Sequence, residues 1–279
     1  MMPMPEPLCE WEGRSLEDWR DAWGIPAFHA FARIPSTNDV GRALAEAGAP
    51  SLTTILAEEQ TAGRGRFGRS WTAPAANALL VSLLLRPSPG APSAPTAPLR
   101  VGIAVAAALE RLGVRSGLKW PNDVVAIDGR KLAGILCEGA VSSTDGRACV
   151  VAGIGINVNQ EAGDLTPELR TQATSIRIIT GRPFARAVIL EAVLDAMRPH
   201  ADRVGHPLSA DEEEQFRRYD RLAGRSVRID GVPAGVANGI TADGALRIAT
   251  PDAERLVWSG TVRIDRGAVV HGPMSEEAS

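Results

Sequence analysis

The sequence predicts an α+β protein in which a region of strands and helices is followed by a small antiparallel barrel. Two observations lead to this fold class. Up to about residue 218, short apolar runs that suit buried strands alternate with amphipathic segments that suit helices. After Tyr219 the chain changes to short alternating runs separated by glycine turns, with Asp-Gly at 230–231 and again at 243–244.

Each element follows from its own stretch of sequence. Residues 1–26 are peripheral, and their tryptophans Trp11, Trp19 and Trp23 are expected to dock on the rest of the protein. A helix should begin at Ser36 or Thr37, whose hydroxyls can cap it, and should end at Gly48. Other helices are expected at 99–113, 185–199 and 210–222, and strands at 27–34, 52–60, 78–86 and 148–159. The segment 117–141 should hold two strands joined by a turn at 127–130. The proline-rich stretch 87–98 should be a surface loop, because its prolines lack N–H groups.

Composition narrows the class of protein. The 279 residues are 44% hydrophobic, which is ample for a sizeable core. A net charge of −3 and a pI near 5.9 argue against a protein whose main function is to bind a nucleic-acid backbone. Three cysteines and four histidines without CxxC spacing favour neither a disulfide framework nor a zinc site. No secretory signal and no membrane-spanning run is evident, so we expect a soluble cytoplasmic protein.

The stretch "GRGRFGRSW" at 63–71 concentrates arginine and glycine. Arginine presents a fixed fork of donors that suits phosphate and carboxylate, and glycine lets the backbone approach a ligand closely. The stretch is neither a Walker A loop nor a convincing dinucleotide fingerprint. From these residues alone, an RNA backbone, a nucleotide or only solvent remains open as its partner.

Two further stretches suggest a binding site. In "GIGINVN" at 153–159, strand alternation puts Ile154 and Ile156 on one face and Gly153, Gly155 and Asn157 on the other. A flat ligand over the glycines, or tight packing of another backbone element there, would explain the bare face.

"KWPND" supplies Lys119, Asn122 and Asp123, and Lys131 of "GRKLAG" comes within reach if the strands pair. Such a group can stabilise phosphoryl charge or take a proton from an amine, although a solvated surface turn has the same composition.

Together, "STND", "EEQTAGRGRFGRSW", "KWPNDV", "GRKLAGIL" and "GIGINVN" in this order resemble the biotin–protein ligases, from about Ala27 to Ile264. The resemblance implies a catalytic domain at 27–218, built on a mixed β-sheet flanked by helices, followed by an SH3-like domain at 219–271 and a tail at 272–279. It also implies a reaction in which biotin and MgATP form biotinyl-5′-AMP. A lysine of a biotin carboxyl-carrier domain then accepts the biotinyl group.

The resemblance also assigns roles to residues. Ser36 and Thr37 should bind the ureido end of biotin, with Asn38, Gln60, Gly63 and Gly65 close by. Gly153 and Gly155 should lie under the biotin rings.

At the other end of the predicted site, Arg64, Arg66 and Lys131 should contact the activated carboxyl and the phosphate. Lys131, Arg66 and Asp123 are the expected catalytic residues. Those expected to bind ATP or the adenylate are Arg69, Trp71, Lys119, Asn122 and Asn157. Magnesium is expected with ATP near Asn157 rather than at a dedicated protein site.

Bifunctional members of that family carry an N-terminal helix-turn-helix. Only 35 residues precede Ser36 and they show no such pattern, so the resemblance implies the monofunctional type, without specific DNA binding. Two alternatives remain: a lipoate–protein ligase, which shares the fold and the adenylation chemistry, and a nucleic-acid-binding protein that uses the Gly/Arg loop.

Overall fold

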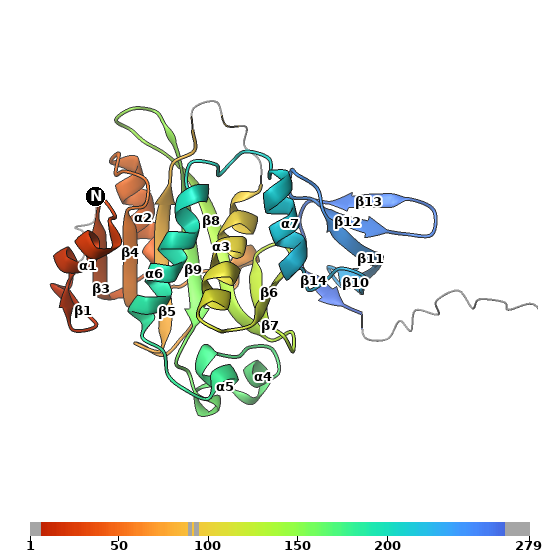
Figure 1. The fold of residues 1–279 in the computed structure, drawn as a ribbon, viewed down its shortest axis with the longest axis horizontal. Coiled ribbons are helices and arrows are strands. Elements are labelled where there is room, and N and C mark those ends of the chain that lie inside the picture. Colours follow the sequence, from red (N-terminus) through yellow and green to blue (C-terminus); the bar gives the residue numbers. More distant parts are fainter. Residues whose placement is uncertain (1–6, 89–90, 92–94, 266–279) are drawn as a thin grey trace, which may run out of the picture.

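The computed structural model describes residues 7–88, 91 and 95–265. Its large sheet contains β3 (Phe28–Ile34), β4 (Thr54–Gln60), β5 (Ala78–Leu85), β6 (Ser116–Lys119), β7 (Asp123–Ala126), β8 (Lys131–Val141) and β9 (Ala148–Asn157). These strands lie in the order β3-β4-β5-β9-β8-β7-β6, and β3 and β4 form the parallel pair of an otherwise antiparallel sheet. The predicted mixed sheet is therefore confirmed (Figure 1).

Helices pack on both faces of this sheet. The α-helices of the described residues are α1 (Leu16–Trp23), α2 (Thr37–Glu46), α3 (Ala97–Arg111), α4 (Pro167–Arg170), α5 (Ile176–Thr180), α6 (Arg186–Met197) and α7 (Ala210–Tyr219). Alternation along β5 shows the two layers, because Leu83 and Leu85 join the main core with α3 and α6, whereas Leu84 joins a second cluster with Val40 of α2. The short α2 covers only part of its face, and the remainder is left for a pocket.

The segment 117–141 forms three strands, so the prediction of two was wrong. The residues Trp120–Asn122 form a turn of their own, which places Lys119 of β6 directly opposite Asp123 of β7. The Trp120 side chain is buried and its indole N–H donates to the carbonyl of Gly244 at 2.9 Å. This extra reversal brings Lys119 and Asp123 to one end of the sheet, beside the start of β8.

The first described residues pack on the main core, as the tryptophans predicted. A two-strand hairpin, β1 (Glu10–Trp11) and β2 (Arg14–Ser15), leads into α1. Trp11 and Trp23 are each only 3% exposed, and Trp19 stacks on Trp23 with ring centroids 4.7 Å apart. Arg186 of α6 joins this segment to the sheet by ion pairs of 2.8 Å with both Glu12 and Glu58.

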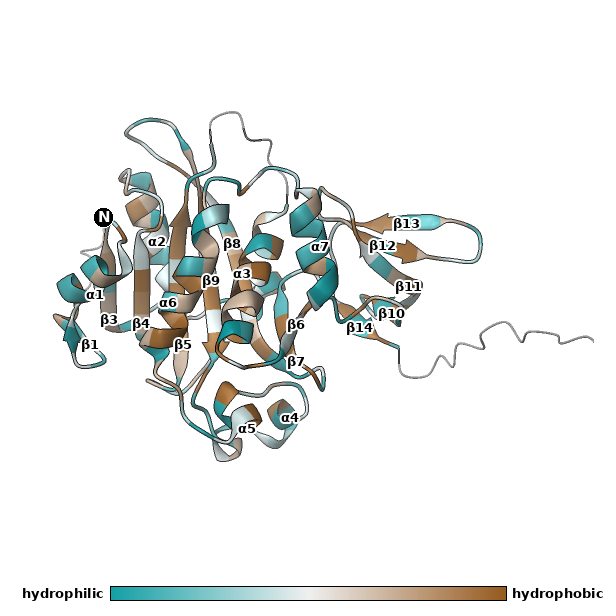
Figure 2. Cartoon of the chain, viewed as in Figure 1, coloured by the Kyte–Doolittle hydropathy of each residue, from teal (hydrophilic) through white to brown (hydrophobic). Residues whose placement is uncertain are grey.

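The C-terminal strands form the predicted small antiparallel unit, which is SH3-like in character. They are β10 (Ser226–Ile229), β11 (Val232–Ile240), β12 (Leu246–Ala249), β13 (Glu254–Val257) and β14 (Val262–Ile264), in the order β13-β12-β11-β10-β14. Apolar residues of these strands, among them Val227, Leu246 and Ile248, belong to the same buried cluster as the main core. Figure 2 shows the hydrophobic segments along both sheets. The expected tail at 272–279, and part of the expected loop at 87–98, lie outside the described residues. Within the described part of the chain, none of the helices is long and apolar enough to cross a membrane.

A buried ion pair ties α3 to α7. The guanidinium of Arg100 is 0% exposed and contacts both carboxylate oxygens of Glu212, at 2.8 and 3.0 Å. The remaining donors of Arg100 reach the hydroxyl of Thr96 and the carbonyls of His206 and Pro207. Every charge-bearing group of this pair thus has a partner, as burial of charge requires.

Candidate functional site

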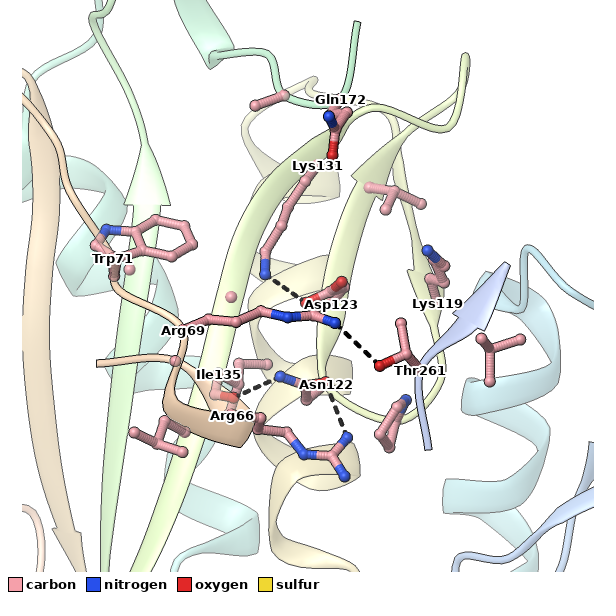
Figure 3. Close-up of a pocket in the computed structure, with 18 of the residues that line it drawn as sticks. Arg66, Arg69, Trp71, Lys119, Asn122, Asp123, Lys131, Ile135, Gln172 and Thr261 are labelled. Atoms are coloured by element: carbon pink, nitrogen blue, oxygen red, sulfur yellow. Dashed lines mark hydrogen bonds and ion pairs between the residues drawn. The ribbon is translucent and has the colours of Figure 1, made fainter. Parts of the chain in front are cut away.

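A pocket of about 670 Å³ opens on the face of the large sheet that α2 leaves uncovered. Its wall is built from the N-terminus of α2, the Gly/Arg segment, the ends of β6 to β9, and residues 260–264 of the C-terminal sheet. Segments far apart in the sequence therefore form one site between the two sheets (Figure 3).

One end of the pocket is polar but uncharged. Gln60 Oε1 accepts hydrogen bonds from the backbone N–H and the hydroxyl of Thr37, at 2.8 and 3.1 Å. Ser82 Oγ lies 2.7 Å from Thr37 Oγ1 and 2.6 Å from Asn38 Oδ1. The Ser36 side chain caps α2, as predicted, by accepting from the N–H of Asn38. These hydroxyls and amides are held in fixed positions by one another.

The Gly/Arg segment forms a short hairpin. Backbone hydrogen bonds join Gly65 to Arg69 and Gly63 to Trp71, at 2.7 and 2.8 Å. At its tip Phe67 and Gly68 both have positive φ, of 57° and 71°, as in the tight turns that suit β-hairpins. Phe67 is a non-glycine residue in the left-handed region and is 63% exposed.

The three arginines of this hairpin have different partners. Arg64 forms ion pairs with Asp39 at 2.8 Å and with Glu138 at 3.1 Å. Arg66 donates to Asn122 Oδ1 at 3.3 Å, and Arg69 donates to Thr261 Oγ1 at 3.1 Å. Burial lowers the pKa of Arg66, with the nearby Asp123 opposing that shift. Two carboxylates thus surround Arg64, whereas Arg66 and Arg69 contact only neutral oxygens in the described residues.

Lys131 is held at the centre of the pocket (Figure 3). Its Nζ lies 2.6 Å from Asp123 Oδ1 and 5.3 Å from the centre of the Trp71 ring. Its backbone is fixed as well, because its N–H donates to the carbonyl of Gln172 and its carbonyl accepts from Thr174. The chain therefore places this cation beside a carboxylate and an aromatic face.

Asn122 and Lys119 complete this end of the pocket. Asn122 Nδ2 donates to the carbonyl of Ile135 at 2.9 Å, which orients its amide oxygen toward Arg66. Burial lowers the pKa of Lys119, and Asp123 partly offsets that effect. Lysine occurs at only two positions in the sequence, 119 and 131, and both line the pocket.

The bare face of β9 contacts side chains of the protein itself. A Cβ at Gly155 would lie 2.5 Å from the Trp71 ring, and a Cβ at Gly153 would lie 2.4 Å from Asn38 Oδ1. The glycines are therefore required for close approach, which was the physical reading of the pattern. In the structure Trp71 covers Gly155, so the flat group on this face is an indole.

Gly155→Ala is expected to lower the free energy of unfolding by about 1–3 kcal/mol, because the added methyl group overlaps the Trp71 ring. Gly139→Ala on the neighbouring strand is the matched control, since nothing lies within 4 Å of its Cβ position. Urea denaturation of both variants measures the difference. Equal unfolding midpoints would show that Trp71 does not pack on β9 in solution.

Most of the residues that the sequence pointed to meet in this pocket. Those in its wall are Ser36, Thr37, Asn38, Gln60, Arg64, Gly65, Arg66, Arg69, Trp71, Lys119, Asn122, Asp123, Lys131, Gly153 and Gly155. Gly63 and Asn157 are not in the wall. Gly63 belongs to the base of the hairpin, and the Asn157 amide is buried in hydrogen bonds with Thr174 and Gln160.

The sequence analysis did not identify several residues that line the pocket or hold its wall in place. Ser82 and Glu138, which bond to residues of the wall, are polar residues within apolar strands, and that pattern could have identified them. Arg221, Arg225 and Arg263 reach the pocket from distant parts of the chain, and no local signal identifies them.

The pocket is cationic although the protein as a whole is acidic. Its wall contains eight cationic side chains, Arg64, Arg66, Arg69, Lys119, Lys131, Arg221, Arg225 and Arg263, and two acidic ones, Asp123 and Asp128. No cluster of three or more His, Cys, Asp or Glu side chains able to hold a metal ion occurs in the described residues. The arrangement suits a ligand with a neutral polar group at one end and one or more anionic groups at the other.

Comparison with known proteins agrees with this geometry. Residues 30–157 match the model of the biotin/lipoate A/B protein ligase family. The chain is 32% identical over 236 residues to the bifunctional ligase/repressor BirA of Bacillus spizizenii, covering 83% of this chain and 72% of the relative. It is 39% identical over 176 residues to the biotin–[acetyl-CoA-carboxylase] ligase of Paracoccus denitrificans, covering 60% and 68%. The structure of the biotin protein ligase of Aquifex aeolicus in complex with biotin and ATP has a TM-score of 0.73 and 28% identity, covering 86% of this chain and 100% of that one.

Proposed function

This chain belongs to the biotin/lipoate A/B protein ligase family and is a ligase, and from that premise we propose that it attaches biotin to a lysine of a biotin carboxyl-carrier domain. The reaction would use MgATP and pass through biotinyl-5′-AMP. The relatives named above support biotin as the acyl group, and the Aquifex aeolicus complex supports ATP as the second substrate.

The observation that carries the proposal is the polarity of the pocket. Its uncharged end is lined by the hydroxyl and amide side chains of Thr37, Asn38 and Gln60, groups of the kind that pair with the ureido group of biotin. The cationic end suits the biotin carboxylate and the phosphates of ATP. A ligand that joins a ureido ring to a carboxylate by an aliphatic chain matches this order of groups.

In the first step, the biotin carboxylate attacks the α-phosphorus of ATP and diphosphate leaves. Lys131 and Arg66 would hold the carboxylate and the phosphoryl oxygens together, so that charge building up in the transition state meets cations already in place. Burial strengthens these contacts, because fewer water molecules screen them. Magnesium would arrive with ATP. Asn157, near which the sequence placed it, lies outside the pocket wall with its amide engaged by Thr174 and Gln160, whereas Asn122 and Asp123 are oxygen-bearing residues of the wall that could contact the ion.

In the second step, the acceptor lysine attacks the activated carbonyl and AMP leaves. A free lysine has a pKa of about 10.4, so it arrives protonated and must lose a proton. Asp123 is the carboxylate nearest to Lys131, and we assign it the role of positioning or deprotonating that amine.

Asp123→Asn tests this assignment. Single-turnover transfer from preformed biotinyl-AMP is expected to be slower in the variant, because the amide cannot accept the proton. Unchanged transfer combined with slower adenylation would place Asp123 in the first step instead.

The proposal as a whole is tested by isotope exchange between ATP and diphosphate. Biotin is expected to support the exchange, and lipoate is expected to support little or none. Exchange with lipoate alone would make the protein a lipoate ligase, and no exchange with either acid would refute the adenylation chemistry. Binding of RNA with a steep dependence on salt would instead support the nucleic-acid alternative.

Three expectations accompany the function. The acceptor should be the carrier domain of a biotin-dependent carboxylase, and the protein should bind no specific DNA sequence. The enzyme is expected to act in the cytoplasm, where its three cysteines would stay reduced.

A further inference from the structure

Glu138 of β8 makes contacts that the proposed chemistry does not use. Its Oε2 accepts from Asn38 Nδ2 at 2.6 Å and lies 3.1 Å from a guanidinium nitrogen of Arg64. Its Oε1 lies 3.1 Å from a guanidinium nitrogen of Arg42, on the side away from the pocket. One carboxylate thus joins α2, the sheet and the first strand of the Gly/Arg hairpin.

These contacts differ from those of a solvated surface ion pair. The Glu138 side chain is 24% exposed, and its partner Asn38 is 3% exposed. Burial opposes ionisation of Glu138, but hydrogen bonds from Asn38 and Arg64 outweigh it and lower its pKa. The Glu138 carboxylate is therefore charged at neutral pH, and it serves as an acceptor for both Asn38 and Arg64.

The Asn38 amide is fully oriented by this arrangement. Its oxygen accepts from Ser82, and its NH₂ group donates to Glu138 and to the carbonyl of Leu136. Without the carboxylate, the Asn38 amide would lose its closest acceptor and Arg64 would lose one of its two carboxylate partners. The neutral end of the pocket and the base of the hairpin would then lose a shared anchor.

We propose that Glu138 is a positioning residue that holds Asn38 and Arg64 in place and thereby sets the affinity of the neutral end of the pocket. On this view Arg64 is an anchor of the hairpin, with its charge neutralised by Asp39 and Glu138, and the anion is bound by the other cations. The inference rests on the proposed function, because it takes biotin as the ligand of that end.

The test is Glu138→Gln, which keeps the shape of the side chain and removes its charge. The KM for biotin is expected to rise about tenfold or more, because contacts to charged groups are lost. The KM for MgATP is expected to stay within about twofold, since the cationic end is unchanged. Partial unfolding of the variant would not raise the KM for biotin while leaving the KM for MgATP unchanged.

Arg42→Met is the matched control. It removes the outer partner of Glu138 but leaves the contacts with Asn38 and Arg64, so the KM for biotin should match that of the wild type. An unchanged KM for biotin in Glu138→Gln, or an equal rise in Arg42→Met, would overturn the inference.

A double-mutant cycle of Glu138→Gln with Arg64→Met gives a second measurement. The two changes are expected to be non-additive for biotin affinity, because each removes the same ion pair. Additive effects would refute the positioning role. Calorimetric titration of the wild type and of Glu138→Gln with biotin separates the two proposals. If the wild type does not bind biotin, the proposed function is wrong. If both proteins bind biotin equally well, only the role of Glu138 is wrong.

Discussion

Replacing Lys131 with methionine is expected to slow formation of biotinyl-AMP by about 100- to 1,000-fold, the usual cost of losing one preorganised contact to developing charge. Methionine preserves the apolar stem beside Trp71 and removes the ammonium group, which lies 2.6 Å from Asp123. In the reaction proposed above, Lys131 and Arg66 would together hold the reacting carboxylate and the α-phosphate, so that loss of the ammonium group leaves Arg66 to contact both. Single-turnover adenylation with radioactive ATP measures the effect.

Arg130→Met is the control for this variant. Arg130 is the preceding cation, lies outside the pocket wall and pairs with Asp128 at 2.7 Å. Its loss should leave adenylation close to the wild-type rate. Melting temperatures of both variants establish that each is folded, and a Lys131→Met enzyme that forms the adenylate at the wild-type rate would remove Lys131 from the mechanism.

The second large effect concerns stability. Glu212→Gln is expected to lower the free energy of unfolding at neutral pH by about 3–5 kcal/mol, because it leaves the fully buried guanidinium of Arg100 without a counter-charge. Urea denaturation measures this loss. Glu214→Gln on the same helix is the control, since Glu214 and its partner Arg217 are both 67% exposed and such pairs contribute little.

The same pair predicts how stability depends on pH. Burial opposes ionisation of Glu212, but hydrogen bonds from Arg100 and from the Ser209 N–H lower its pKa from 4.5 to about 2. Because the folded-state pKa is the lower one, this contribution is fully present above about pH 4.5 and is lost as the pH falls toward 2. Glu212→Gln should lack this part of the acid dependence, and an identical pH profile in both proteins would show that the pair does not form.

The parts of the fold that were predictable are those set by local patterns. The alternation of Ile154 and Ile156 with Gly153 and Gly155 defines both faces of β9, because side chains of a strand point alternately to opposite sides. The Ser36 cap marks the start of α2 for a similarly local reason. The extra strand between 117 and 141 was missed because three residues suffice for a turn that the sequence does not separate from its flanking strands.

Most of the motif residues come together in one pocket, but the contacts among them could not be predicted. The resemblance assigned Arg64 to the activated carboxyl and the phosphate of a ligand, and the structure places the protein's own Asp39 and Glu138 beside it. Glu138 lies 74 residues away along the chain, and only the register of β8 against β9 brings it to this position. Long-range ion pairs of this kind depend on tertiary packing, and no short stretch of the sequence indicates which distant residues will meet.

The restriction of lysine to positions 119 and 131 has a consequence for chemical selectivity. An acyl adenylate reacts readily with free amines, whereas the guanidinium of arginine stays protonated and is a poor nucleophile. In the proposed reaction, therefore, no lysine side chain outside the pocket would compete with the acceptor for the activated acyl group. For the experimenter, modification of lysine side chains by an amine-selective reagent, counted separately from that of the α-amino group, would report on the pocket, and protection by bound ligand could be read as occupancy.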